Sequence, residues 1–424
     1  MISKRVENLR FNFTVNVLDG AFFGAALGFA SFITVIPLFV ANLTESAVLI
    51  GLIPAIHSVG WQLPQLFTAP RVSRLSRYKR MALLMTLNER IPFFFLALVA
   101  WFSPQLGVEI SLTLTFILLI WQGFGGGFTA TAWQSLIAKI MPGEIYGRFF
   151  GAQSAAATLL MGIGAILAGL VLTAYYTPLD YTLCFLIAGI MMMISFFFLS
   201  LTREQETPPI SRTKEEGSSF RSDLGAIIST DKDFRWYVIS RMLTQFATMA
   251  FAFYTIFAVR EFGMDERLVG FLTGLLFFTE VAVNPILGWL GDLRGHLLTL
   301  RIGIVATIIS VFLAMFANSV AWFFVIFILA GIANVAVWTV PLSMTLEFAP
   351  ESQRPAYIGL SNTLIAPATF IAPIFAGILI DKTSYDLTFF ASGIAGLMTL
   401  LVLFVAVKDP RRKAKVQAEI SPTD

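Results

Sequence analysis

Long apolar runs separated by short polar segments dominate the pattern of the chain. Each run holds about 20 predominantly apolar residues, the length that an α-helix needs to cross a hydrocarbon core of about 30 Å. The pattern predicts twelve transmembrane helices, at roughly residues 14–40, 48–69, 81–102, 110–138, 149–175, 181–201, 236–259, 268–290, 298–317, 320–345, 355–380 and 386–407.

The composition places the chain outside the soluble proteins. Only 13% of its residues are charged and 57% are hydrophobic, whereas a soluble domain carries about 25% charged residues. The runs leave no room for a soluble domain. One cysteine, Cys184, and two histidines, His57 and His296, exclude a disulfide and a cysteine- or histidine-rich metal site. We therefore expect an all-α integral membrane protein that uses neither a metal nor a cofactor.

Basic residues gather on alternate connecting segments. If the N-terminus is cytoplasmic, 24 of the 29 lysines and arginines lie on cytoplasmic segments and three on outer loops. Cytoplasmic loops carry the excess of lysine and arginine in membrane proteins. Both termini are therefore predicted to be cytoplasmic, in what we expect to be a bacterial inner membrane.

A single long polar segment, residues 202–235, divides the chain into two similar halves. The predicted organisation is a six-helix bundle over 1–201, a cytoplasmic linker over 202–235, a second six-helix bundle over 236–407 and a cytoplasmic tail over 408–424. A shift of 219 residues places Gln65 on Asn284 and Ala69 on Gly288. Two alignable halves predict bundles related by pseudo-twofold symmetry, as in two-bundle carriers.

The stretch from Gly288 to His296 ends the eighth apolar run and reads GWLGDLRGH. Its glycines allow two helices and a tight turn to approach closely. We expect the N-terminus of the next helix to stabilise the charge of Asp292. In the corresponding part of the first half, Ser73 takes the place of this acid.

This stretch resembles the signature between the second and third helices of each half in the major facilitator superfamily, and the chain is similar to that family over essentially its whole length. The resemblance implies a two-bundle fold of twelve helices and a cytoplasmic gate motif made of Gly288, Gly291, Asp292, Arg294 and Gly295. The pair Gln122-Gly123 resembles part of a second family motif, but Leu119 stands where that motif has arginine.

Ionisable groups at membrane depth are costly, so each is a functional candidate. Asp19 lies in the first run, beside a face formed by glycines. It either binds a proton or a cationic substrate group, or serves as a structural hydrogen-bond acceptor. Glu280 lies midway through the eighth run, with Asn284 one turn further. A carboxyl that desolvation keeps neutral there would carry a proton; the alternative is a protonated acid bonded to a neighbouring helix.

Two arginines also lie at membrane depth. Glu89 and Arg90 interrupt the third run, and they serve either transport or a structural ion pair to the second or sixth helix. Arg241 and Gln245, one turn apart in the seventh run, are cavity candidates because the resemblance implies that the first and seventh helices line the path. Arg241 is expected to pair with an anionic substrate or with Asp19.

Further polar and aromatic residues share helix faces that are either packed or exposed to a cavity. His57, Trp61 and Gln65 recur every four residues in the second run. A cavity lined by indoles and amides favours an amphipathic solute. The expected cavity residues are His57, Trp61, Gln65, Gln122, Gln245, Asn284, Asn334 and Trp338.

The sequence thus predicts a secondary active transporter that works by alternating access, coupled to protons or to sodium, with export of an amphipathic compound favoured over uptake of a sugar or organic anion. A non-transporting sensor or scaffold is the alternative from another class. An enzyme is not expected, because no Ser/His pair or metal-ligand cluster has usable spacing, and no phosphate-binding loop is present. The expected partners are a small solute and the lipid bilayer, without nucleic acid, and the protein is expected to be a monomer.

Overall fold

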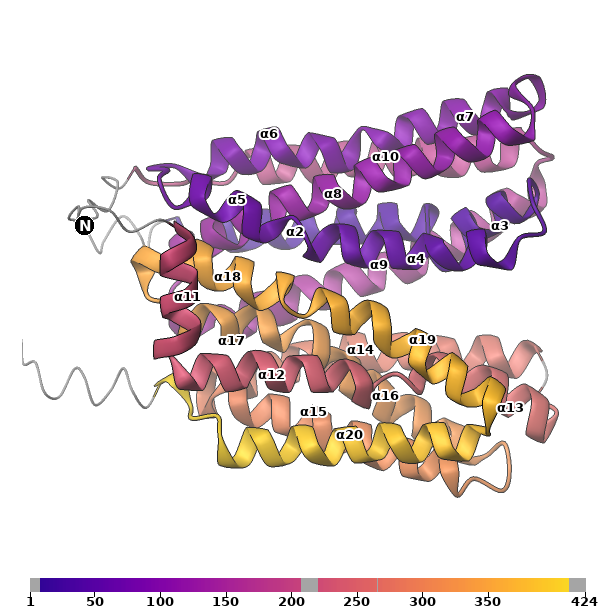
Figure 1. The fold of residues 1–424 in the computed structure, drawn as a ribbon. Coiled ribbons are helices and arrows are strands. Elements are labelled where there is room, and N and C mark those ends of the chain that lie inside the picture. Colours follow the sequence, from indigo (N-terminus) through magenta and orange to yellow (C-terminus); the bar gives the residue numbers. More distant parts are fainter. Residues whose placement is uncertain (1–7, 207–219, 265, 412–424) are drawn as a thin grey trace, which may run out of the picture. The chain divides into compact units, whose positions relative to one another are not determined.

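The computed structural model describes residues 8–206, 220–264 and 266–411, and all regular secondary structure in these ranges is helical. The first half contains α2 (Leu9–Phe29), α3 (Val35–Ala41), α4 (Ala47–Gln62), α5 (Gln65–Val72), α6 (Tyr78–Arg90), α7 (Pro92–Leu106), α8 (Val108–Ile140), α9 (Tyr146–Ala174) and α10 (Leu179–Ser200). The second half contains α11 (Phe220–Thr230), α12 (Lys232–Ala247), α13 (Tyr254–Phe262), α14 (Glu266–Arg294), α15 (His296–Met315), α16 (Trp322–Trp338), α17 (Val340–Phe348), α18 (Arg354–Thr363), α19 (Ala366–Lys382) and α20 (Tyr385–Val405) (Figure 1).

Every predicted apolar run is helical, which confirms the all-α class. In the described part of the chain, ten helical segments are long and apolar enough to cross a membrane. The first two runs are not among them. The first is interrupted between α2 and α3, and α2 carries Asn12, Asn16 and Asp19 among its buried residues. The second is divided at Pro64 into helices of 16 and 8 residues.

Prolines account for several of the interruptions within a predicted run. Proline has no N–H to donate, and its ring clashes with the carbonyl one turn earlier, so a helix ends or kinks there. Pro92 begins α7, and Pro341 and Pro367 lie at the starts of α17 and α19. The third, tenth and eleventh runs are therefore each built from two helices in sequence.

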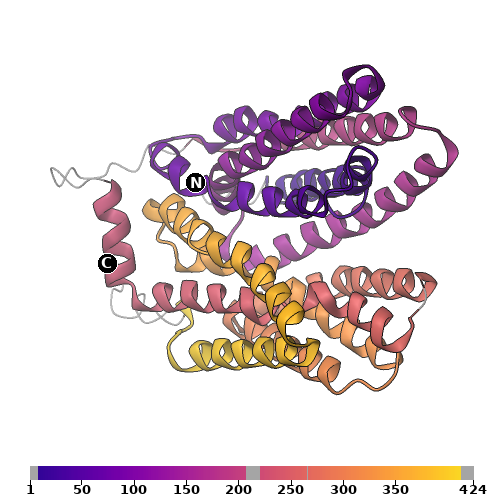
Figure 2. The same cartoon turned by 45° about the vertical axis from the view of Figure 1, so that its right-hand side comes forward.

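The chain forms two compact units. The first comprises Met1–Pro142, Gln153–Ser211 and Ile358–Thr363, and the second comprises Gly143–Ala152, Arg212–Tyr357 and Leu364–Asp424. The start of α9 is thus part of the second unit, and most of α18 is part of the first. Within the second unit, α11 runs crosswise to α12, as both views show (Figures 1 and 2). The predicted linker 202–235 therefore contains a helix, and its residues 207–219 lie outside the described residues.

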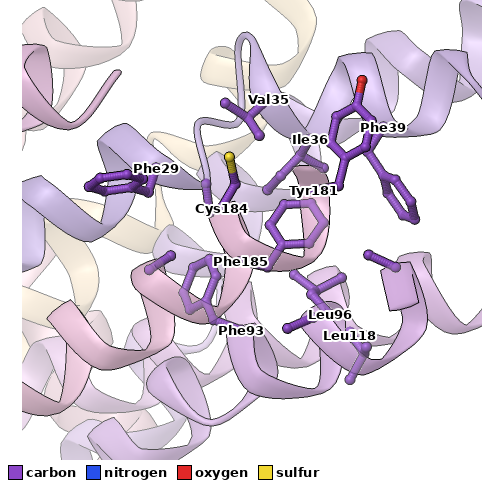
Figure 3. Close-up of a cluster of buried hydrophobic side chains, with 14 of the residues drawn as sticks. Phe29, Val35, Ile36, Phe39, Phe93, Leu96, Leu118, Tyr181, Cys184 and Phe185 are labelled. Carbon is purple, nitrogen blue, oxygen red and sulfur yellow. The ribbon is translucent and has the colours of Figure 1, made fainter. Parts of the chain in front are cut away.

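An aromatic and aliphatic core holds the first unit together around α10, which packs against α2 and α7 (Figure 3). Phe39 of α3 contacts two rings of α10, with centroids 5.3 Å from Tyr181 and 5.5 Å from Phe185. Cys184 is buried in the same cluster as a free thiol. Edge and tilted ring pairs of this kind contribute about 0.5–1.5 kcal/mol beyond area burial.

The second unit has its own aromatic core. Phe257 of α13 lies edge-on to Phe389 of α20, with centroids 5.0 Å apart, and contacts Phe323 of α16 at 6.2 Å. Tyr254 extends this cluster and exchanges a hydrogen bond of 3.0 Å with Ser310 of α15. These contacts join α13, α15, α16 and α20.

The glycine face of α2 packs against α9. A Cβ on Gly28 would lie 2.9 Å from the Cα of Gly164, and one on Gly24 would overlap the backbone of Ala157. Close backbone approach through small residues is how membrane helices gain packing contacts without a hydrophobic driving force. This contact fixes the rotation of α2 and hence the direction in which Asp19 points.

Candidate functional site

A buried group of charged residues lies between α2, α6 and α10 in the first unit. Asp19 and Arg90 are 5% and 2% exposed, and the Arg90 Nη2 lies 3.2 Å from the Asp19 Oδ1. Ser195 of α10 donates a hydrogen bond of 2.6 Å to the same carboxylate oxygen and accepts one of 2.9 Å from Arg90. Arg90 also donates to Thr86 and, over 3.2 Å, to the Met192 carbonyl.

Glu89 is the second carboxyl of this group and is buried as well. Its Oε2 lies 3.8 Å from the Arg90 Nη1, which is beyond hydrogen-bonding distance. Two glycines of α8 make room for it. A Cβ on Gly126 would lie 2.7 Å from the Glu89 Oε1, and one on Gly125 would lie 2.6 Å from the Glu89 backbone nitrogen. Sequence reasoning passed over these glycines, although three consecutive glycines within a helix were a usable signal.

The charges in this buried group do not balance. Two carboxylates, Asp19 and Glu89, share one guanidinium, that of Arg90. A net negative charge in a low-dielectric interior is costly, because desolvation favours the neutral form of an acid. A proton held by one of the two carboxyls makes the group neutral. The arrangement can therefore take up and release a proton with a change of one charge.

Trp61 of α4 lies near the same group, and His57 lies one turn earlier on that helix. The His57 Nδ1 and the Gln122 Oε1 are 3.1 Å apart, and the imidazole stacks on Phe32 with centroids 4.0 Å apart. Trp61 approaches Gly126, because a Cβ added at Gly126 would lie 3.2 Å from the Trp61 Cδ1. The Gln122 Nε2 is buried without a hydrogen-bond partner among the described residues. An unsatisfied buried donor of this kind is available to a ligand or water.

Gln65, the third residue on this face of α4 and α5, is fully buried. Its Nε2 donates a hydrogen bond of 2.9 Å to the Trp61 carbonyl, and its Oε1 accepts one of 2.7 Å from the Asn362 side chain. Both bonds lie within the first unit. Gln65 therefore has partners for its donor and its acceptor.

In the second unit, the Glu280 carboxyl of α14 faces α16. Its Oε1 accepts a hydrogen bond of 2.9 Å from the Asn334 Nδ2. Asn284 donates to the Glu280 backbone carbonyl over 2.9 Å, while its own Oδ1 is buried without a partner among the described residues. The Trp338 side chain is 47% exposed. Glu280 and Asn284 of α14 and Asn334 of α16 thus form a group of polar residues joined by hydrogen bonds.

Arg241 and Gln245 are both buried on α12. The Arg241 guanidinium lies 6.0 Å from the centre of the Tyr237 ring. Arg241 belongs to the second unit and Arg90 to the first. The carboxylate of Asp19, also in the first unit, is paired with Arg90.

The Gly288 motif lies at the end of α14, where Asp292 binds the start of α9. The Asp292 carboxylate accepts hydrogen bonds from the backbone nitrogens of Gly147 (2.7 Å) and Arg148 (2.8 Å) and from the Arg148 Nε (3.0 Å). Helix N-termini present free N–H groups and a partial positive charge to anions. The side chain of Asp292 is only 2% exposed, so this interaction is weakly screened.

The helix that binds Asp292 is not the one that the sequence suggested. We expected the next helix in the chain, α15, whereas the N–H groups come from α9, more than 100 residues earlier. Gly295, with φ of +99°, turns the chain between α14 and α15. His296 thereby opens α15 beside Asp292, with its Nε2 3.8 Å from the Asp292 Oδ1.

The glycines of the motif each allow a specific close approach. A Cβ on Gly288 would overlap the Gly147 carbonyl, and one on Gly291 would lie 2.5 Å from the His296 Cδ2. The Arg294 side chain is exposed. In the first half, the Ser73 hydroxyl at the matching position donates to the Pro70 carbonyl one turn earlier (2.9 Å).

An arginine from the C-terminal segment joins this motif, which sequence reasoning missed. Arg411 donates hydrogen bonds to Glu347 Oε1 (2.7 Å from its Nε) and to the Asp292 backbone carbonyl (2.6 Å). His296 Nδ1 lies 2.7 Å from the same Glu347 oxygen. The Glu347 carboxylate is buried, and its charge is paired with the Arg411 guanidinium from the segment after α20.

A sequence model of the Major Facilitator Superfamily matches residues 18–260 and 237–422. The chain belongs to this superfamily. The predicted family is thereby confirmed, and the many apolar helices are those of an integral membrane protein.

Individual relatives are distant. The chain is 24% identical over 159 residues to the transporter YuxJ of Bacillus subtilis (strain 168), which is 38% of this chain and 40% of YuxJ. It is 18% identical over 154 residues to the quinolone resistance protein NorA of Staphylococcus aureus, which is 36% of this chain and 39% of NorA. These matches span about two fifths of the relatives' length. The transporter YttB of B. subtilis matches at 21% over 309 residues, which is 70% of this chain and 73% of YttB.

Solved structures of the superfamily confirm the fold. FucP in the outward conformation superposes with a TM-score of 0.76 at 13% identity, covering 93% of this chain and 98% of FucP. A bacterial homologue of the iron transporter ferroportin, in its outward-facing state, gives 0.71 at 15% identity over 93% of this chain and 98% of the homologue. At such identities the likeness concerns the superfamily fold, with its twelve helices, and not the substrate.

Proposed function

We propose that this chain is a proton-coupled secondary transporter that exports an amphipathic compound by alternating access. The observation that carries the coupling is the unbalanced buried group of Asp19, Glu89 and Arg90. When both carboxyls are ionised, the group has one negative charge more than Arg90 offsets. A proton or a cationic substrate removes this excess, so the two compete for the same place.

Glu280 is the corresponding candidate in the second half. Its one hydrogen bond from a side chain comes from the neutral amide of Asn334, so no cation offsets an ionised carboxylate in that contact. A carboxyl in such surroundings also holds a proton readily. We assign the proton pathway to Asp19, Glu89 and Glu280, with Arg90 as the fixed counter-charge and Arg241 as a further cavity cation.

Export of an amphipathic compound is supported by side chains of α4 and α8 in the first unit. His57, Trp61 and Gln122 combine aromatic faces with amide groups, and the free Gln122 donor is available to a solute. The similarity to NorA, which is named for quinolone resistance, agrees with export. The competing proposal is uptake of a sugar or organic anion by symport or facilitated diffusion.

The conformational cycle is proposed to break and reform the contact of Asp292 with Gly147 and Arg148. These residues come from opposite halves of the sequence, so alternating movement of the bundles proposed over 1–201 and 236–407 would separate them. We place the contact on the cytoplasmic side of a bacterial inner membrane, with the linker 202–235 and the tail 408–424 on that side, and propose a monomer as the working unit.

Transport driven by an imposed pH gradient tests the coupling. Purified protein in proteoliposomes is loaded with ethidium, a cationic amphipathic dye, and the flux is followed by fluorescence with and without the gradient. Wild-type protein is expected to move the dye faster with the gradient. Asp19→Asn and Glu280→Gln are each expected to remove most of this gradient-driven part. If both variants keep it intact, the assignment of coupling to these carboxyls is wrong.

A further inference from the structure

A groove of about 470 Å³ opens on the surface of the first unit, where the chain passes from α5 to α6. This volume lies within the range of roughly 300–1,000 Å³ that is typical of small-molecule sites. Side chains from α5, α6 and α8 and two arginines line it, among them Phe67, Arg71, Arg74, Met81, Met85 and Phe128.

The groove has a basic end and an apolar end. Arg71 lies in the last turn of α5 and Arg74 follows that helix, so both guanidinium groups belong to its end. Phe67 lies one turn back into the predicted apolar run and is 76% exposed. Met85, two turns into α6, and Phe128, in the second half of α8, continue the apolar wall. Polarity therefore changes along the groove in the way that it changes from the headgroups to the acyl chains of a bilayer.

Other basic residues near this turn are already paired with acids of the following segment. Arg77 forms an ion pair of 2.7 Å with Glu206, and Lys139 forms one of 2.8 Å with Glu204. Glu204 also accepts hydrogen bonds of 2.8 Å from the backbone nitrogens of Tyr78 and Lys79. The carboxylates of this region are thus engaged with cations outside the groove.

Arg71 and Arg74 differ from these neighbours. In residues 8–206, 220–264 and 266–411, neither guanidinium has a carboxylate within ion-pair distance. Guanidinium groups bind phosphate oxygens with directed, often bidentate hydrogen bonds. Two of them at the end of an apolar groove fit a phosphate that is attached to acyl chains, and basic pockets between membrane helices are known binding sites for such headgroups.

We propose that this groove binds one anionic phospholipid, whose phosphate contacts Arg71 and Arg74 and whose acyl chain lies along Phe67 and Phe128. The proposal does not depend on the transported solute or on proton coupling. It adds a lipid-specific site beside the segment that corresponds, in the first half, to the Gly288 motif. The lipid composition of the membrane would thereby determine whether the segment between α5 and α6 has a bound lipid.

The test measures the affinity of the purified full-length protein in detergent for two lipids with the same chains, palmitoyl-oleoyl phosphatidylglycerol and palmitoyl-oleoyl phosphatidylcholine, by native mass spectrometry. Wild-type protein is expected to bind the phosphatidylglycerol at least tenfold more tightly. Arg71→Gln combined with Arg74→Gln is expected to weaken that binding about 30-fold, because each basic residue near the surface contributes about a factor of five to anionic-lipid binding. Binding of phosphatidylcholine should stay unchanged.

Arg80→Gln is the matched control. Arg80 is exposed in the same region but does not line the groove, so its substitution removes a positive charge outside the groove. It is expected to change the phosphatidylglycerol affinity less than about threefold. Glycerophosphoglycerol, which has the headgroup without chains, should not displace the lipid at equal concentration. Equal affinity of wild-type protein for the two lipids, an equal loss in Arg80→Gln, or displacement by the chain-free headgroup would each overturn the proposal. If the double variant does not fold, the phosphatidylglycerol affinities of the single variants Arg71→Gln and Arg74→Gln are compared with that of Arg80→Gln in the same way.

Discussion

The carboxylate of Asp292 caps the start of α9 by accepting a hydrogen bond of 2.7 Å from the backbone nitrogen of Gly147. The two residues are 145 positions apart and come from opposite halves of the sequence. A charge placed on free N–H groups is stabilised by up to about 2 kcal/mol in partly buried sites. An interaction of this size is strong enough to bias a conformational equilibrium and weak enough to break in each transport cycle.

Asp292→Asn is expected to slow transport on the order of tenfold. Asparagine can still accept a hydrogen bond from Gly147 or Arg148, but it has no charge for the N-terminus of α9 or for the Arg148 guanidinium. The measurement is solute flux in proteoliposomes at equal protein incorporation. Ser73→Ala is the control from the other half, since the Ser73 hydroxyl bonds only to the Pro70 carbonyl in the described structure. Equal effects of the two variants would contradict the larger role assigned to Asp292.

Gly288→Ala is expected to impair both stability and transport. Its new methyl group would overlap the Gly147 carbonyl, and backbone cannot move aside as a flexible side chain can. Gly274→Ala, in the same helix α14, provides the comparison, because a Cβ there meets nothing within 4 Å. We expect the melting temperature in detergent to fall for Gly288→Ala and to stay or rise slightly for Gly274→Ala. A fall of the same size in both variants would contradict the proposed close contact.

Arg90→Met should destabilise the first unit strongly, by about 3–5 kcal/mol, because removing one partner of a buried ion pair leaves the charge of Asp19 without an opposite charge. Combining it with Asp19→Asn should recover a large part of this loss, because the unpaired charge of Asp19 is then removed as well. Thermal unfolding of the two single variants and the double variant measures the coupling. Additive losses would show that Asp19 and Arg90 do not interact as described.

Arg411→Ala is expected to lower the melting temperature, since Glu347 would keep only His296 as a partner and the Asp292 carbonyl would lose a donor. The loss should be about 1.5–3 kcal/mol, the usual contribution of charge-assisted hydrogen bonds. Lys408→Ala removes an exposed positive charge from the same segment and should change stability by less than about 0.5 kcal/mol. If Lys408→Ala is as damaging, the effect is one of net charge and not of the contact with Glu347.

The helices could be predicted from the sequence because their signal is local. Each run of apolar residues lies in one stretch of chain, and the predicted runs are helical. The breaks at Pro64, Pro92 and Pro341 were not predicted, because each of these runs was expected to form a single helix. The signature around Gly288 likewise gave the family, which the match over residues 18–260 and 237–422 confirms.

The partners of the buried polar groups could not be predicted in the same way. Arg90 pairs with Asp19 across 71 positions, and Arg411 reaches Glu347 across 64. Which helix face meets which is set by close packing, such as that of Gly28 on Gly164, and a single sequence does not reveal it. The roles of Asp19, Glu89, Glu280 and the other candidate residues in transport stay predictions.

The central claim is that buried carboxyls, Glu89 in the first unit and Glu280 in the second, carry the coupled proton, and infrared spectroscopy of the purified protein tests it most directly. A protonated carboxyl gives a C=O stretching band that is separate from the amide bands and shifts in heavy water. Wild-type protein is expected to show this band at neutral pH and to lose it when pH is raised. Glu89→Gln and Glu280→Gln together should remove most of it. A wild-type protein without the band, or a double variant that retains it in full, would contradict the proposed proton site.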